Sequence, residues 1–154
     1  MKKLLGIVLV FISYIGYSQN NVEARDPIYQ TDFSMDLIGN HSSIGISKYK
    51  SPTIKDSRII FNTEIASCDK SNGIELVLST GETLYFENAR IACVPMENGN
   101  FHLYGSLLLT IELYHKLSQI EILDFKLGTT KVPVVFKEKG ENLKVLFKFS
   151  EGNY

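Results

Sequence analysis

The chain contains few residues whose types and spacing could carry out chemistry. Its three histidines are His41, His102 and His115, and a histidine base needs a serine or cysteine nucleophile beside it. No nucleophile-elbow motif GxSxG occurs in the sequence. His102 also alternates out of an apolar strand face together with Tyr104, which directs it toward solvent. We therefore interpret the histidines as ordinary polar residues and predict no catalytic residue.

Motifs for cofactors and metals are missing as well. Neither GxGxxG nor GxxxxGK(S/T) is present, so the sequence predicts no cofactor. A zinc site is not predicted, because the chain has no CxxC, no HExxH and no closely spaced His–Cys pair. Residues 69–75 faintly resemble a calcium loop, but Gly73 falls one position early and an oxygen ligand is missing. Asp, Ser, Asn and Gly are the residues of an ordinary turn, and this is the interpretation that we favour.

The first 18 residues have the layout of a secretory signal peptide. Lys2 and Lys3 precede an apolar run from Leu4 to Ile15, and small residues follow at the positions that signal peptidase requires. We predict cleavage between Ser18 and Gln19. The alternative is an uncleaved membrane tether, which the short apolar run disfavours because a span needs about 20 residues. The sequence thus predicts export to the periplasm or the extracellular medium.

Export changes the interpretation of the two cysteines, Cys68 and Cys93. In an oxidising compartment we expect them to form a disulfide, with free thiols as the alternative. In a simple meander the strand at 74–78 would separate them. The bond therefore requires Cys68 to lie beyond the end of that strand, or residues 90–94 to fold onto another sheet after a phase slip at 87–88.

Charge excludes one class of partner. Loss of Lys2 and Lys3 leaves 14 of the 16 basic residues against 17 acidic ones, a net charge of −3, which gives no support for nucleic acid. Residues 126–148 carry an excess of four positive charges. This excess could bind an anionic partner. We favour the alternative that these lysines lie on solvated strand faces, where they discourage edge-to-edge aggregation. A speculative binding face comprises His102, Tyr104, Lys144 and Lys148.

Two-residue alternation of apolar and polar side chains recurs along the chain and predicts short strands. The segments concerned lie at 32–37, 59–65, 74–78, 83–86, 90–94, 101–109 and 143–149. The last of these shows the alternation most clearly. Residues 110–119 instead space their apolar side chains by three and four, which predicts a short helix with Thr110 as its N-cap.

This pattern predicts a mainly β fold, an antiparallel sandwich or barrel of eight or nine short strands with one short helix near residues 110–119. We assign residues 1–18 to the signal peptide, 19–31 to a loosely ordered leader and 32–154 to a single β-rich domain. We expect no stable membrane insertion after cleavage, since no later segment is apolar enough.

The predicted function is non-enzymatic. We expect an exported, soluble β-domain that binds a protein or a cell-surface polymer. Two alternatives stay open: a small β-barrel that carries an apolar ligand, and a hydrolase whose residues converge only in the folded chain. A wide internal cavity would favour the carrier, and a cleft uniting His102 with a serine and an acid would favour the hydrolase.

Overall fold

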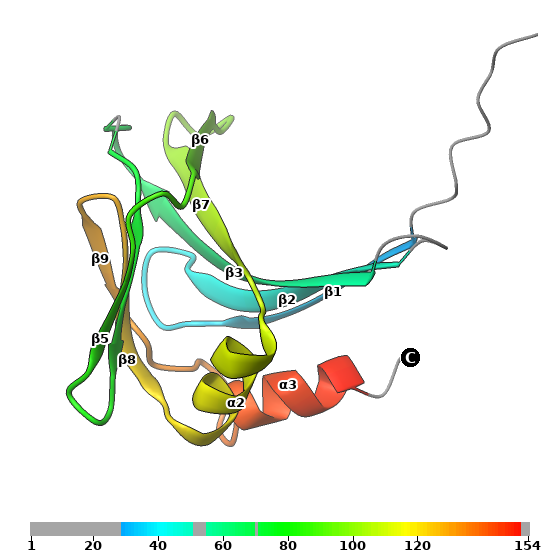
Figure 1. Cartoon of the computed structure of the whole chain (residues 1–154). Helices are drawn as coiled ribbons and strands as arrows, with labels where there is room; N and C mark the ends of the chain where they lie inside the picture. The colour runs from blue at the N-terminus through cyan, green and yellow to red at the C-terminus, as the bar shows by residue number, and fades with distance from the viewer. Residues whose placement is uncertain (1–28, 51–54, 70, 152–154) are drawn as a thin grey trace, which may run out of the picture.

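A computed structural model describes residues 29–50, 55–69 and 71–151 (Figure 1). These residues form nine strands in two antiparallel sheets, together with two helices. The predicted mainly β sandwich is confirmed, and the two sheets do not close into a barrel. The predicted signal peptide and its cleavage site at Ser18 and Gln19 lie outside the described residues.

The larger sheet has five strands in the order β1-β2-β3-β7-β6. Their bounds are Tyr29–Asp36 for β1, Ser43–Lys50 for β2, Lys55–Ile65 for β3, Ile91–Pro95 for β6 and Phe101–Leu108 for β7. The smaller sheet has the order β5-β4-β8-β9. Its strands are β4 (Ile74–Leu78), β5 (Thr83–Phe86), β8 (Ile122–Leu127) and β9 (Thr130–Pro133).

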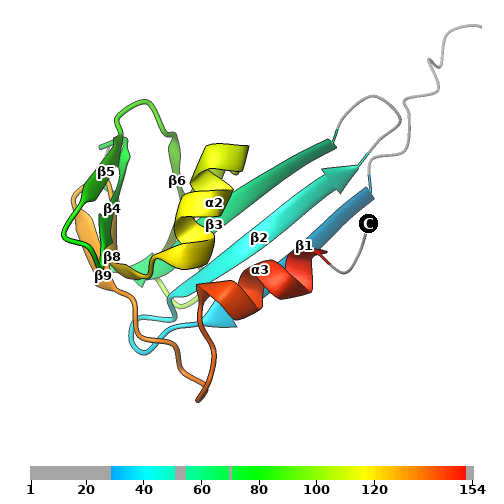
Figure 2. The same ribbon diagram turned by 60° about the horizontal axis from the view of Figure 1, so that its bottom comes forward.

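The core lies on one face of the five-stranded sheet, which we call the inner face. Both helices and the four-stranded sheet lie on this side, as Figures 1 and 2 show from two directions. Ile59 and Phe61 of β3 are fully buried there, and the ring of Phe61 lies 5.0 Å from that of Phe125. The sheets approach closely at Gly105, where an added Cβ would lie 2.9 Å from the side-chain tips of Ile74 and Ile91.

The phase slip predicted at 87–88 marks a change of sheet. Strand β5 ends at Phe86 in the four-stranded sheet, and β6 begins at Ile91 in the five-stranded one. A tight turn joins them, with the amide of Ala89 donating to the carbonyl of Phe86 at 3.0 Å. Arg90 to Val94 therefore do fold onto another sheet. This satisfies one of the two conditions set for the cysteine pair.

The predicted helix at 110–119 is confirmed as α2, Ile111–Gln119. Thr110 caps it, since its hydroxyl oxygen accepts a hydrogen bond from the amide of Leu113 at 3.2 Å. Leu113 and Leu117, four residues apart, are both buried against the core. The four-residue spacing of Leu113 and Leu117 thus identified the buried face of α2, whereas Ile111, at the start of the helix, is 77% exposed.

The strand predicted at 143–149 is wrong, because this segment forms helix α3, Leu143–Glu151. The oxygen of the Asn142 side chain accepts a hydrogen bond from the amide of Val145 at 3.0 Å and so caps the helix. Leu143, Leu146 and Phe147 are buried at helical spacing. The two-residue alternation was misleading because Leu146 falls outside it and belongs to the helical stripe.

Further boundaries differ from the prediction. Strand β1 begins at Tyr29, three residues inside the leader assigned to 19–31, and residues 19–28 lie outside the described chain. Strands β2, β8 and β9 were not predicted individually. None of the helices in the described ranges has the length and apolar character needed to cross a membrane.

Candidate functional site

The outer face of the five-stranded sheet is the side turned away from the helices. Successive residues of a strand point to opposite faces, so Asn62 and Glu64 of β3 point outward between the buried residues Phe61 and Thr63. On β7 the same reasoning places His102 and Tyr104 on this face. None of the described elements covers it in Figure 1.

The pairing of β3 with β7 brings a group of polar side chains together at one end of this face. Glu64 lies opposite His102, and Asn62 lies opposite Tyr104. The turn between β6 and β7 adds two further amides that reach Glu64. We call this group the β3–β7 cluster, and it consists of Asn62, Glu64, Asn98, Asn100, His102 and Tyr104.

Glu64 is the best-anchored member of the cluster. Its Oε1 accepts a hydrogen bond from Nδ2 of Asn98 at 2.8 Å and another from Nδ2 of Asn100. These bonds to the ionised form, from Asn100 foremost, hold the pKa of Glu64 below its usual value, and the charges of His41 and His102 act in the same direction. Its Oε2 lies 3.9 Å from Nε2 of His41, too far for a hydrogen bond. The Glu64 side chain is only 13% exposed, so its carboxylate is largely enclosed by its neighbours.

His41 approaches Glu64 because the β1–β2 turn folds back onto β3. Gly39, Asn40 and His41 all adopt left-handed backbone conformations, with φ of 93°, 48° and 45°. The carbonyl of Asn40 accepts a hydrogen bond from the amide of Glu64 at 2.9 Å. The turn therefore forms a rim beside the cluster.

His102 is held by an amide. Its Nε2 lies 3.0 Å from Oδ1 of Asn62, whose Nδ2 donates to the Ser43 hydroxyl at 3.1 Å. An amide oxygen can only accept, so Nε2 of His102 is the donor. The ring of Tyr104 meets that of His102 edge-on at a centroid distance of 5.7 Å. His102 therefore contacts an amide and an aromatic ring here, and not a nucleophile that it could activate as a base. Tyr104 remains 41% exposed.

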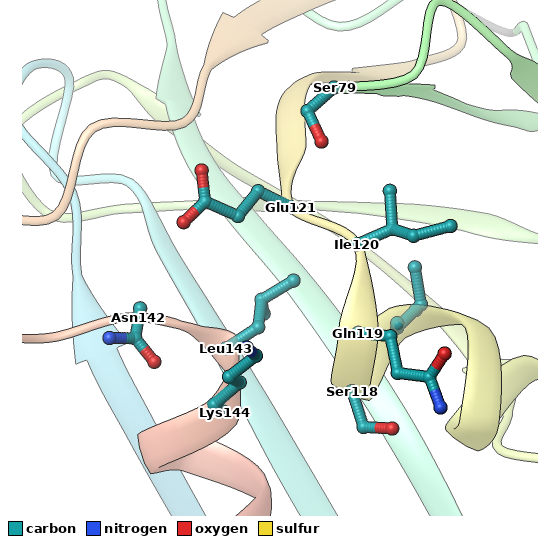
Figure 3. Close-up of a pocket in the computed structure, with 9 residues that line it drawn as sticks. Ser79, Ser118, Gln119, Ile120, Glu121, Asn142, Leu143 and Lys144 are labelled. Atoms are coloured by element: carbon teal, nitrogen blue, oxygen red, sulfur yellow. The ribbon is translucent and has the colours of Figure 1, made fainter.

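A hollow of about 320 Å³ lies elsewhere, between the two helices (Figure 3). The end of α2, Glu121, Ser79 and the start of α3 line it. Asn142 uses its side-chain oxygen there to cap α3, and the amide of Ser79 donates to the carbonyl of Glu121 at 2.9 Å. These polar groups serve the local structure, so the hollow is a weaker candidate than the cluster.

The speculative binding face does not come together as one surface. His102 and Tyr104 lie on the outer face, whereas Lys144 and Lys148 are exposed on α3, which packs against the inner face. The basic residues of 126–148 were expected on strand faces, but those from 143 onward lie on α3. Basic side chains of this region therefore belong to separate elements.

The two cysteines are paired in the structure. Their Cα atoms lie 6.2 Å apart, within the range that a disulfide spans. Cys68 lies in the loop after β3 and Cys93 lies in β6, so β7 separates the two strands concerned. The pair ties the β3–β4 loop to the edge strand that leads into the turn of Asn98 and Asn100.

Asp69 belongs to a turn, as the sequence suggested. Its carboxylate accepts hydrogen bonds from the Ser71 amide at 3.1 Å and from the hydroxyls of Ser71 and Thr129. These bonds lower the pKa of Asp69, with the Ser71 hydroxyl having the largest effect. In the described part of the chain, no group of three or more His, Cys, Asp and Glu side chains could hold a metal ion.

Sequence reasoning missed four members of the cluster, namely Asn62, Glu64, Asn98 and Asn100. Asn62 and Glu64 lie within the alternating segment 59–65, and Asn98 and Asn100 lie just before the one at 101–109. Nothing in either pattern distinguishes these four residues from other polar residues. A correct pairing of β3 with β7 would have revealed the group. Comparison with protein-family models, with curated proteins and with solved structures found no match to this chain.

Proposed function

We propose that this protein is an exported, non-enzymatic domain that binds an extracellular macromolecule through the outer face of its five-stranded sheet. The supporting observation is the β3–β7 cluster, in which exposed Asn98, His102 and Tyr104 adjoin partly buried polar side chains, and hydrogen bonds and a ring contact hold the group in place. Because these bonds already fix the side chains, little conformational entropy is lost when a ligand binds.

The hydrolase alternative receives no support from this geometry. A general base must lie within hydrogen-bond reach of the group that it activates. His102 instead bonds an amide, and Glu64 accepts from two amides. The carrier alternative loses its basis as well, because Phe61, Phe125 and Phe147 fill the interior between the layers.

Cell-surface binding tests the proposal. The labelled mature domain is titrated onto intact cells and envelope fractions of the source organism, alongside a His102→Ala/Tyr104→Ala variant. Exposed substitutions usually change stability little, so this variant should fold, as circular dichroism and thermal unfolding will verify. We expect saturable binding by the parent and at least a tenfold loss in the variant.

A matched control is a Lys144→Ala/Lys148→Ala variant, which changes two exposed residues on the other side of the sheet. It should bind like the parent. Absence of saturable binding by the parent, or equal binding by the outer-face variant, would contradict the proposal. Export has its own test, because mass spectrometry of the secreted protein should show a chain that begins at Gln19.

A further inference from the structure

We propose that Asn98 is a site of spontaneous deamidation, in which the backbone nitrogen of Gly99 displaces ammonia and leaves an aspartate or isoaspartate in the β3–β7 cluster. The chain contains two Asn-Gly pairs, Asn72-Gly73 and Asn98-Gly99. Asparagine is a thermolabile residue, and a following glycine hinders the reaction least because it has no Cβ. The surroundings of the two pairs assign the reaction to Asn98. This inference does not depend on what the outer face binds.

The reaction needs no reagent other than water. The Gly99 nitrogen loses its proton to hydroxide and attacks Cγ of Asn98, so that a new N–C bond forms and negative charge develops on Oδ1. The bond from Cγ to Nδ2 then breaks, and Nδ2 takes a proton from water and leaves as ammonia, which regenerates the hydroxide. Water opens the resulting cyclic succinimide at either carbonyl and gives aspartate or isoaspartate. Nothing is oxidised or reduced.

A hydrogen bond favours the attack at Asn98. Its Oδ1 accepts from the backbone amide of Asn100 at 3.0 Å. A fixed N–H aimed at an oxygen where negative charge develops stabilises the transition state, and such donors act at about 2.7–3.1 Å. Within the described residues, no hydrogen bond engages the side chain of Asn72. Only the first of the two asparagine carbonyls named here, that of Asn98, is therefore activated by the fold.

The attacking nitrogen is also less restrained at Gly99 than at Gly73. The Gly99 amide donates to the carbonyl of Met96 at 3.2 Å, at the long end of the normal range. No atom outside its chain neighbours lies within 4 Å of the position that a Cβ on Gly99 would take. The Gly73 amide instead donates to the carbonyl of Ala89 at 2.9 Å, and its carbonyl accepts from the amide of Gly128 at 3.0 Å. The nearest backbone atom of the β5–β6 turn lies 3.5 Å from its Cβ position.

Conversion of Asn98 changes the β3–β7 cluster. Its Nδ2 donates to Oε1 of Glu64 at 2.8 Å, and the product replaces this donor by a second carboxylate. A neighbouring like charge disfavours the ionised form of an acid, so the pKa of Glu64 should rise. The isoaspartate product also adds a methylene to the backbone of the turn that joins β6 to β7. Deamidation therefore weakens the cluster without any enzyme.

Long incubation of the mature protein in mildly alkaline buffer tests the proposal. Peptide mass spectrometry with fragmentation distinguishes conversion of Asn98 from that of Asn100, and an isoaspartyl methyltransferase detects the isomer. The Asn72-Gly73 pair is a control within the same chain. In the native protein Asn98 should convert at least about tenfold faster than Asn72, because one donor to a developing oxyanion changes a rate by about a hundredfold or more in an enclosed site. In guanidinium-unfolded protein the two rates should become similar.

An Asn98→Asp variant tests the consequence, with Asn72→Asp as the matched control. NMR titration should show a raised pKa for Glu64 in the first variant and the parent value in the second. Equal rates at the two asparagines in the native protein would overturn the proposed site. An unmodified Asn98 under conditions that convert both asparagines in the unfolded chain would overturn it as well. An unchanged Glu64 pKa in Asn98→Asp would overturn the effect on the cluster.

Discussion

Replacement of both cysteines by serine should cost the domain a large part of its stability. The bond between Cys68 and Cys93 closes a loop with a sequence separation of 25. In the chain-entropy treatment, a loop of this size restricts the unfolded state by about 3.5 kcal/mol. For a domain of this length, that loss corresponds to a fall of roughly 10–15 °C in Tm. The loss is large because the free energy of unfolding of a typical domain is only about 5–15 kcal/mol.

Besides lowering the global stability, loss of the bond should loosen the part of the sheet that it holds. Strand β6 lies at the edge of its sheet and pairs with β7 alone, so the cysteine bond is a second attachment for it. Without the bond we expect β6 and the adjoining turn to open more readily than the rest of the sheet. Hydrogen exchange at the amides of 91–100 should therefore accelerate beyond the global change.

The assay begins with protein purified from an oxidising compartment. It is alkylated under denaturing conditions without reductant and weighed, which counts the free thiols. Urea unfolding then compares the oxidised parent, the reduced and alkylated parent, and the Cys68→Ser/Cys93→Ser variant. The two forms without the bond should unfold at similar, lower urea concentrations. Two blocked thiols in the starting protein, or equal midpoints for all three forms, would refute the reasoning.

Three further predictions concern the core and the cluster. Phe147→Ala should lower the free energy of unfolding by about 3–5 kcal/mol, because its buried ring packs 5.2 Å from that of Tyr114; a smaller loss in urea unfolding would mean that α3 is not docked. Gly105→Ala should cost about 1–3 kcal/mol by overpacking the sheet contact, and an unchanged midpoint would contradict that packing. Glu64 should titrate by NMR below the usual pKa of a glutamate, and Asn100→Ala should raise that pKa toward normal. The pKa of Glu64 is lower in the folded state than in the unfolded state, so its stabilising effect is fully present above the unfolded-state pKa and is lost as the pH falls through the folded-state pKa. A Glu64→Gln variant should therefore lose less stability on acidification than the parent. Identical curves of stability against pH for the two proteins would contradict this assignment.

Local patterns predicted the elements whose periodicity was unambiguous. The alternation at 59–65 corresponds to a strand with one buried face, and Thr110 with its helical spacing corresponds to α2. The segment 143–149 satisfied two periods at once. In the folded protein the segment has the helical period, and the resulting helix α3 packs against α2, β1 and β2. Tertiary contacts of this kind cannot be predicted from a local sequence pattern.

The cluster was beyond prediction for a different reason. Asn62 and His102 are 40 residues apart, and their hydrogen bond depends on the register of β3 with β7. A shift of that register by one residue would move every side chain of β7 to the other face. Residue types alone therefore identified His102 and Tyr104 as exposed, but could not supply their neighbours.

The change of sheet after β5 has a consequence for when the β3–β7 cluster can form during synthesis and folding. Strands β4 and β5 are placed in the second sheet before β6 and β7 return to the first. A nascent chain that has emerged only as far as β5 possesses Glu64 but not the strand that completes its surroundings. Pairing across so long a separation is slow, on a scale of about milliseconds to seconds. Chaperones and proteases thus meet a chain in which the β3–β7 cluster has not yet formed, and a proteolytic fragment ending before Phe101 lacks His102 and Tyr104.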